Sequence, residues 1–304
     1  MKKDFVSIHD RTPGEIAALL DLADAIKSDP ARYRQALAGK TLAMIFEKSS
    51  TRTRVSFEAG MYQLGGLGMF LSSRDLQIGR GEPISDTARV LSRYVNGIMA
   101  RTFAHETVTE LARHATVPVI NGLTDLLHPC QVMADLQTIR ENFGKLAGLK
   151  LAYVGDGNNM AHSLMFGGAK TGMSVAIASP EGFEPKGEMV AAARADAAET
   201  GAEISTTRDP SEAAAGAHVV YTDVWASMGQ EDEAEKRRAR FAGFGVTDAL
   251  MAKARDEAIF LHCLPAHRGE EVSASVADGP RSRIFDEAEN RLHAQKAVLV
   301  SLMA

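Results

Sequence analysis

Short apolar segments alternate with segments of helical periodicity along almost the whole chain, and this alternation restricts the possible folds more than any other feature. The apolar segments are continuous runs, which is typical of strands buried on both faces. Strands that alternate with helices form βαβ units, whose strands run parallel. We expect strands at residues 41–46, 68–71, 97–100, 117–120, 149–154, 174–178, 203–206, 218–222 and 258–261, with helical segments that include 13–27, 132–143, 187–199 and 286–302.

The length of the chain predicts more than one domain. Its 304 residues exceed what a single hydrophobic core usually supports. We therefore expect an α/β protein with two doubly wound domains, each with a central parallel sheet flanked by helices. A turn at residues 145–148 precedes a strong strand, so we place the domains at 1–145 and 146–285, and expect 286–304 to form a C-terminal helix that packs back on the first domain.

The composition argues against several kinds of partner. The formal net charge of -5 gives no electrostatic attraction to nucleic acid. No apolar stretch approaches the roughly 18 residues that a membrane-spanning helix needs. The two cysteines are far apart in the sequence and suggest no disulfide framework. The start of the chain has lysines but no apolar targeting segment. We expect a cytoplasmic protein that binds neither nucleic acid nor membrane.

A cluster of hydroxyls with an arginine follows the first predicted strand. Ser50, Thr51, Arg52 and Thr53 precede a segment with helical spacing. The first N–H groups of a helix lack partners, and the helix dipole adds partial positive charge there. A guanidinium can also bind two oxygens of one anion, so the cluster is suited to a phosphate. An ordinary capped helix with a solvated arginine is the alternative.

Polar or reactive side chains also follow other predicted strands. In open parallel sheets ligands bind at the carboxyl ends of strands, so these positions are candidates for a site. They are Arg101 after 97–100, His128 and Gln131 in the segment after 117–120, the GDGNNM segment after 149–154, Asp223 after 218–222, and His262, Cys263, Leu264 and Pro265 after 258–261.

Two glycine patterns match nucleotide-binding motifs only in part. The segment 39–41 (GKT) looks like the end of a P-loop, but Arg34 stands where that motif requires glycine. Gly155 and Gly157 follow a strand, but Met160 replaces the third glycine of the dinucleotide fingerprint. A nicotinamide enzyme therefore remains an alternative on the fold alone.

The residues His262, Cys263 and His267 admit two further alternatives, a metal site or a Cys/His nucleophile. Metal sites usually have a fourth ligand at a defined spacing. A nucleophilic cysteine needs an adjacent base, and a lone cysteine at the end of a strand is more often buried structure. We favour both alternatives less than a site for a small anion.

Three sequence blocks occur in an order and at separations that point to one enzyme family. They are Ser50-Thr51-Arg52-Thr53-Arg54, His128-Pro129-Cys130-Gln131 and His262-Cys263-Leu264-Pro265. In these blocks the chain resembles the aspartate and ornithine carbamoyltransferase family, and the similarity runs through nearly its whole length. The segment 223–229 (DVWASMG) and Cys263 are similar to the members that use ornithine, because members that use aspartate have proline in place of Cys263.

The resemblance implies an enzyme of arginine metabolism that uses carbamoyl phosphate. The carbamoyl group would pass to the δ-amine of L-ornithine by direct attack through a tetrahedral intermediate, giving L-citrulline and phosphate, in a cleft between the two domains. The resemblance implies no cofactor and no metal. Putrescine, N-acetylornithine or aspartate are alternative acceptors, and a nucleotide-binding α/β oxidoreductase is a distant alternative.

The resemblance also implies that the first domain binds carbamoyl phosphate. The phosphate would be held by Ser50, Thr51, Arg52 and Thr53. Arg101 would bridge the phosphate and the carbonyl oxygen, to which His128 would also donate. Gln131 and the backbone carbonyl of Leu264 would accept from the carbamoyl NH₂, and Arg291 would reach the same pocket. Gln77 would contribute to the site of a neighbouring subunit. A shared site of this kind requires a homo-oligomer, either a trimer or a multiple of trimers.

The second domain would bind ornithine. Asn159, Asp223, Ser227 and the backbone at Met228 match positions that hold the α-amino and α-carboxylate groups. An aspartate suits a cationic amine because the hydrogen bond is charge-assisted. Cys263 would lie near the attacking amine and position it, since no covalent intermediate is needed when both substrates are held together. The resemblance thus implies a catalytic set of Arg101, His128, Gln131 and Cys263.

Overall fold

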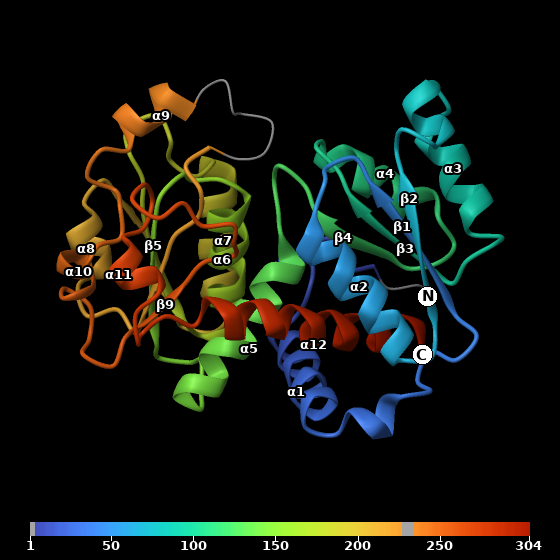
Figure 1. Cartoon of the computed structure of the whole chain (residues 1–304), viewed down its shortest axis with the longest axis horizontal. Coiled ribbons are helices and arrows are strands. Elements are labelled where there is room, and N and C mark those ends of the chain that lie inside the picture. The colour runs from blue at the N-terminus through green and yellow to red at the C-terminus, as the bar shows by residue number, and fades with distance from the viewer. Residues whose placement is uncertain (1–3, 227–233) are drawn as a thin grey trace. The chain divides into compact units, whose positions relative to one another are not determined.

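The computed structural model describes residues 4–226 and 234–304 (Figure 1). Two compact units are present, one from residues up to Gln137 together with Glu289–Ala304, and one from Thr138–Ala288. Each unit has a parallel sheet flanked by helices, so the predicted α/β class with two doubly wound parts is confirmed. The turn expected to divide the domains, at 145–148, lies inside the second unit.

The sheet of the first unit reverses its strand order beside β1. Its strands occur in the spatial order β2-β1-β3-β4 and all neighbours are parallel. The chain moves from β1 to β2 on one side and then returns to place β3 on the other side of β1. The carboxyl ends of β1 and β3 therefore flank a topological switch point, where ligands of open parallel sheets bind. The strands are β1 (Thr41–Phe46), β2 (Leu67–Ser72), β3 (Gly97–Arg101) and β4 (Val119–Leu123).

Helices bury the faces of this sheet (Figure 1). α3 and α4 share a core cluster with the strands that includes Ala88. α12 packs on α1 through Ala297 and Ile26, and Lys27 donates to Asn290 Oδ1 at 2.8 Å, so the end of the chain belongs to the first unit. The helices are α1 (Pro13–Ser28), η1 (Pro30–Tyr33), α2 (Thr51–Gln63), η2 (Gln77–Arg80), α3 (Ile84–Leu91), α4 (His105–His114), the start of α5 (Pro129–Phe143) and the end of α12 (Ile284–Met303).

The sheet of the second unit has the same kind of reversal, between β5 and β8. Its spatial order is β7-β6-β5-β8-β9, again all parallel. The strands are β5 (Lys150–Val154), β6 (Ser174–Ala178), β7 (Ile204–Thr207), β8 (Val219–Tyr221) and β9 (Ile259–Leu261). The helices are α6 (Asn159–Thr171), α7 (Gly187–Ala197), α8 (Pro210–Ala214), α9 (Ala234–Arg240), α10 (Asp248–Met251) and α11 (Ala274–Ala277). Among the described helices of both units, none has the length and apolar character needed to cross a membrane.

The predicted strands are all present, but β4 lies further along the chain than expected. It spans Val119–Leu123 instead of residues 117–120. Asn121 and Gly122 interrupt the apolar pattern, so the pattern ends before the strand does. Asn121 is nevertheless fully buried, because its Nδ2 donates to the backbone oxygen of Val6 at 3.0 Å. A buried amide with a satisfied donor is tolerated in a core, so polarity alone was misleading here.

Candidate functional site

The predicted phosphate segment forms the start of α2. Ser50 is the N-cap, with an extended backbone, and its Oγ accepts from the Thr53 N–H at 3.1 Å. Thr51, Arg52 and Thr53 make the first helical turn. The cap satisfies one of the first N–H groups and leaves the partial positive charge of the helix end in place. Ordinary capping and anion binding are therefore compatible at this position.

Two buried arginines converge on the hydroxyl of Thr53. Arg101, the last residue of β3, donates from Nη1 at 3.3 Å, and Arg291 of α12 donates from Nη2 at 3.0 Å. The exposed fractions of Arg101 and Arg291 are 7% and 3%. Two cations gathered at a neutral hydroxyl, beside a helix N-terminus, produce a positive field that favours an anion at the ends of β1 and β3.

The amide of Gln131 is oriented by its two neighbours. Arg291 Nη1 donates to its Oε1 at 2.6 Å, and its Nε2 donates to Asp135 Oδ1 at 2.8 Å. The oxygen therefore lies on the side of the arginines. Since a carbonyl oxygen has two lone pairs, it can accept a second hydrogen bond from a ligand.

His128 lies directly before α5 in the same cluster. Its pKa is held well below 6.5, first by burial and then by the charges of Arg291, Arg101 and Arg52. A neutral imidazole can donate one N–H to a carbonyl oxygen without adding a further buried cation. Arg52 also acts on this histidine, so the charges of three arginines meet where the sequence predicted the anion.

Cys130, next to these residues in sequence, has a structural environment. It is buried, its Sγ donates to the backbone oxygen of Asn121 at 3.3 Å, and burial raises its pKa to about 12. A thiol with so high a pKa is not a nucleophile near neutral pH. Gln77, the residue predicted to serve another subunit, is exposed at the start of η2.

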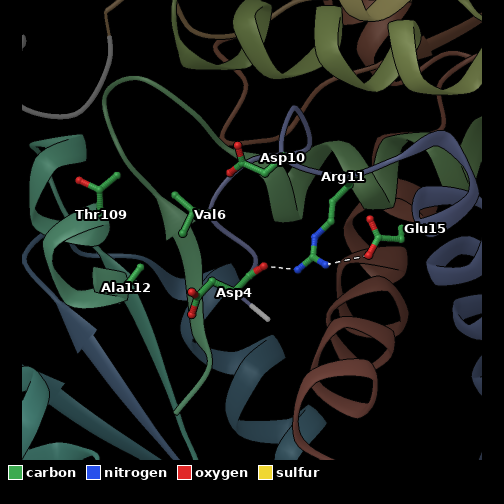
Figure 2. Close-up of a pocket in the computed structure, with 7 residues that line it drawn as sticks. All are labelled: Asp4, Val6, Asp10, Arg11, Glu15, Thr109 and Ala112. Atoms are coloured by element: carbon green, nitrogen blue, oxygen red, sulfur yellow. Dashed lines mark hydrogen bonds and ion pairs between the residues drawn. The ribbon is translucent and has the colours of Figure 1, made fainter. Parts of the chain in front are cut away.

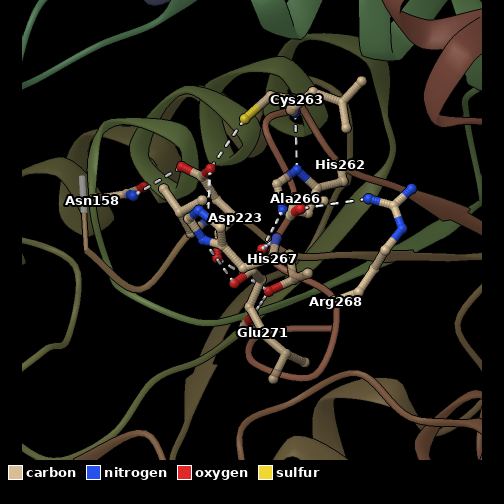
Figure 3. Close-up of polar contacts among 12 residues, drawn as sticks. Asn158, Asp223, His262, Cys263, Ala266, His267, Arg268 and Glu271 are labelled. Carbon is tan, nitrogen blue, oxygen red and sulfur yellow. Dashed lines mark hydrogen bonds and ion pairs between the residues drawn. The ribbon is translucent and has the colours of Figure 1, made fainter. Parts of the chain in front are cut away.

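In the second unit the carboxylate of Asp223, just beyond β8, is held on both oxygens (Figure 3). Its Oδ1 accepts from the Val224 N–H at 2.8 Å and from Cys263 Sγ at 3.1 Å, and its Oδ2 accepts from Asn158 Nδ2 at 3.1 Å. Only 7% of Asp223 is exposed. The structure thus brings the predicted Asp223 and Cys263 together at the switch point between β5 and β8.

Sequence reasoning named Asn159 but missed Asn158. Asn159 is the first residue of α6, whereas Asn158 is the N-cap and the residue that contacts Asp223. Asparagine directly before a helical segment is a recognisable N-cap signal, and it could have identified Asn158. Ser227 and Met228, the other predicted ornithine contacts, lie outside the described residues.

The turn after β9 is held by a buried histidine and a buried carboxylate (Figure 3). His262 Nδ1 accepts from the Leu264 N–H at 2.9 Å, and Nε2 lies 3.2 Å from Glu271 Oε1. A backbone N–H can only donate, so Nδ1 is unprotonated and Nε2 donates to Glu271. Leu264 has a φ of 60°, a left-handed conformation that costs a residue with a side chain roughly 1–2 kcal/mol, and the bond to His262 helps to hold it.

The hydrogen bonds of His262 and Cys263 argue against a metal site and against a nucleophilic cysteine. Ligand atoms of Asp223, His262 and Cys263 lie within 4.8 Å of one another, as do those of His267, Glu270 and Glu271. A metal on His262 would have to replace either the bond from Leu264 or the bond to Glu271. The Cys263 thiol donates to a carboxylate, which stabilises the thiol rather than the thiolate that a nucleophile requires.

Glu271 is expected to make folding stability depend on pH. Burial alone would raise its pKa, but the hydrogen bonds from His262 and the His267 N–H outweigh burial and lower the pKa below 4.5. A lowered folded pKa gives stability that is present above about pH 4.5 and lost as the pH falls through the folded value. We expect Glu271→Gln to lower the free energy of unfolding by about 1–3 kcal/mol at pH 7, and by less as the pH falls below 4.5.

Urea unfolding of the parent protein and of Glu271→Gln between pH 7 and pH 3 measures the difference in their free energies of unfolding. Glu199→Gln is the control, since Glu199 is exposed, and its difference from the parent is expected to be small at every pH. If the free energy of unfolding of Glu271→Gln stays below that of the parent by the same amount down to pH 3, the lowered pKa of Glu271 is not a source of pH-dependent stability.

A separate hollow of about 460 Å³ lies elsewhere in the first unit (Figure 2). Arg11 reaches across it and donates to Glu15 at 3.4 Å and to the backbone oxygen of Asp4. None of its lining residues belongs to the predicted site. They are Asp4, Val6, Asp10, Arg11, Glu15, Thr109 and Ala112.

Polar side chains in each unit gather at strand ends beside the reversal of strand order. Ligands of open α/β sheets bind at such positions. The first unit offers the cations of Arg101 and Arg291 there, and the second unit offers the carboxylate of Asp223. The carbamoyl-P binding domain of aspartate/ornithine carbamoyltransferase matches residues 3–141, and the Asp/Orn binding domain matches residues 147–302. The chain belongs to the aspartate/ornithine carbamoyltransferase family.

Individual relatives are similar over their whole length. An ornithine carbamoyltransferase of Anoxybacillus flavithermus is 64% identical, covering 99% of this chain and 96% of that protein. An ornithine carbamoyltransferase of Oceanobacillus iheyensis is 60% identical, covering 99% and 94%. The solved structure of ornithine carbamoyltransferase from Pyrococcus furiosus has a TM-score of 0.96 at 53% identity, covering 99% of this chain and 97% of that one.

Proposed function

We propose that this chain is an ornithine carbamoyltransferase, which transfers the carbamoyl group of carbamoyl phosphate to the δ-amine of L-ornithine and releases L-citrulline and phosphate. The observation that carries the proposal is full-length similarity, at 60–64% identity, to proteins named for this activity. The site adds chemical support. Cationic groups surround the end of β1 in one unit, and a buried carboxylate follows β8 in the other.

The first unit supplies the groups that the donor requires. Carbamoyl phosphate is a dianion, and the N-terminus of α2 with Ser50, Thr51, Arg52 and Thr53 offers amides, hydroxyls and a guanidinium for its phosphate. Arg101 and the neutral His128 donate to the carbonyl oxygen, where negative charge develops in the tetrahedral intermediate. Gln131 Oε1, on the side of Arg291, accepts from the carbamoyl NH₂.

The second unit supplies the groups for the acceptor. Asp223 receives the α-ammonium group in a charge-assisted hydrogen bond. Asn159, Ser227 and the Met228 backbone hold the remaining α-groups, which leaves the δ-amine free for attack. Cys263, which donates to Asp223, lines the path of that amine and positions it.

The reaction then needs no covalent enzyme intermediate. The δ-amine attacks after losing its proton, the C–N bond forms as the carbonyl oxygen takes up charge, and collapse of the tetrahedral intermediate breaks the C–O bond to phosphate. The nitrogen loses a second proton, so that the neutral ureido group of citrulline and phosphate leave. Holding both reactants in place accounts for the larger part of the acceleration, with the arginines and His128 stabilising the oxyanion.

One assay decides between acceptors. The purified protein is incubated with carbamoyl phosphate and, in turn, with ornithine, N-acetylornithine, putrescine and aspartate, and both phosphate and the ureido product are measured. We expect product with ornithine. Product with aspartate alone, or phosphate release without any ureido product, would overturn the proposal.

The proposal includes a homotrimer or a multiple of trimers. The edge strand β2 and the adjoining α2 carry exposed apolar side chains, with exposed fractions of 56% at Val55 and Leu67 and 43% at Met69, and uncovered apolar edges usually mark an interface. Light scattering is expected to give three times the chain mass of 32.6 kDa or a multiple of it. Met69→Glu is expected to give single chains, whereas Phe285→Glu, at another exposed position, should leave the mass unchanged.

We also place the protein in the cytoplasm. Cys130 and Cys263 are both free thiols. Free thiols persist in reducing compartments, whereas proteins of oxidising compartments are usually rich in disulfides.

A further inference from the structure

Asn158 performs two tasks with the two ends of one amide group. Its Oδ1 accepts from the N–H groups of Met160 and Ala161, at 2.9 and 3.4 Å, and so caps α6. The Tyr153 hydroxyl lies 3.4 Å from the same oxygen. Because the helix N–H groups can only donate, this end of the amide must be the oxygen, and the NH₂ end must face the other way.

The NH₂ end faces Asp223. Asn158 Nδ2 donates to Asp223 Oδ2 at 3.1 Å, while Cys263 and the Val224 N–H occupy Oδ1 (Figure 3). With a donor on each oxygen, the plane of the carboxylate cannot rotate without breaking a hydrogen bond. The helix cap therefore sets the orientation of a carboxylate 65 positions away in the chain.

The topology explains why these two residues meet. Asn158 follows β5 and Asp223 follows β8, and these adjacent parallel strands flank the reversal of strand order. The nearby Asp156 is engaged by Arg237 at 2.6 Å. Asn158 is a side chain that links the start of α6 to Asp223.

We propose that Asn158 is a positioning residue for the acceptor amino acid, holding Asp223 in the orientation that receives the α-ammonium group. This inference rests on the proposed ornithine carbamoyltransferase function. Asn158 itself is committed to α6 and to Asp223, so it acts through the carboxylate rather than by contact with the reacting atoms.

Two substitutions separate this task from capping. Asn158→Ser keeps an efficient N-cap but removes the donor to Asp223, and Asn158→Asp keeps the cap but sets a second carboxylate against Asp223. We expect the KM for ornithine to rise about tenfold or more in Asn158→Ser and further in Asn158→Asp, since a hydrogen bond to a charged group is lost. The KM for carbamoyl phosphate should stay within about twofold, because these residues do not belong to the anion site, and Tm should stay within a few degrees.

Controls distinguish the possible failures. Asp209→Ser, which exchanges one good N-cap for another at α8 in the same unit, should leave both KM values unchanged. If the wild type makes citrulline but folded Asn158→Ser has an unchanged KM for ornithine, the positioning role is wrong and the proposed function stands. If the wild type makes no citrulline, the proposed function fails and the inference falls with it. Should Asn158→Asp not fold, Asn158→Ser alone decides.

Discussion

Arg52→Ala is expected to lower kcat/KM for carbamoyl phosphate by about a hundred- to a thousandfold while the protein stays folded. Arg52 lies in the first turn of α2 beside the Ser50 cap, and its charge reaches His128. In the proposed reaction it binds the phosphate and balances the charge that develops as phosphate leaves. Loss of one preorganised electrostatic stabiliser typically costs this much. Alanine favours helix and leaves the cap intact, so stability should change little.

Steady-state kinetics with each substrate varied in turn measure the effect. Arg113→Ala is the matched control, since Arg113 lies on a helix of the same unit but is exposed and paired with Glu110 at 2.8 Å. It should retain nearly full activity. Near-normal turnover by a folded Arg52→Ala would mean that the phosphate binds elsewhere.

Asp223→Asn is expected to raise the KM for ornithine by about a hundredfold and to leave the KM for carbamoyl phosphate nearly unchanged. An amide removes the charge that attracts the α-ammonium group. Its NH₂ would also face either Asn158 Nδ2 or the Cys263 thiol, which are both donors to the carboxylate. A hydrogen bond to a charged group is worth about 1.5–3 kcal/mol, and about 2.7 kcal/mol corresponds to a hundredfold.

The control for charge alone is Asp256→Asn, because Asp256 is an exposed aspartate of the same unit. Its kinetic constants should match those of the wild type. Equal increases in the KM values of both substrates for Asp223→Asn would point to a general loss of structure, and an unchanged KM for ornithine would remove Asp223 from the acceptor site.

The strands were predictable because each is a local pattern. Continuous runs such as 41–46 and 174–178 have the composition of strands buried on both faces, and the structure has β1 and β6 at these residues. The prediction of β4 was displaced because Asn121 is polar, although its hydrogen bond to Val6 allows full burial. That bond joins residues 115 positions apart and leaves no local signal.

The candidate site was predictable to the extent that its residues follow strands. Positions such as Arg101 and Asp223 could be named from their place after an apolar run. The catalytic role of Arg101 and the substrate-binding role of Asp223 stay predictions. Asn158, which caps α6, has a weaker local signal than its neighbour Asn159, which matches a position of the family. Arg291 was named from family resemblance alone, because nothing local in α12 indicates a bond to Thr53, 238 positions away.

Local sequence patterns were sufficient to predict the alternation of strands and helices, the α/β class and the family, since periodicity, caps and short motifs involve neighbouring residues. The spatial order of the strands depended on packing between distant segments, which local periodicity does not encode. That order places the reversals between β1 and β3 and between β5 and β8. This order of the strands brings together Thr53, Arg101 and Arg291 in one unit. In the other unit it brings together Asn158, Asp223 and Cys263.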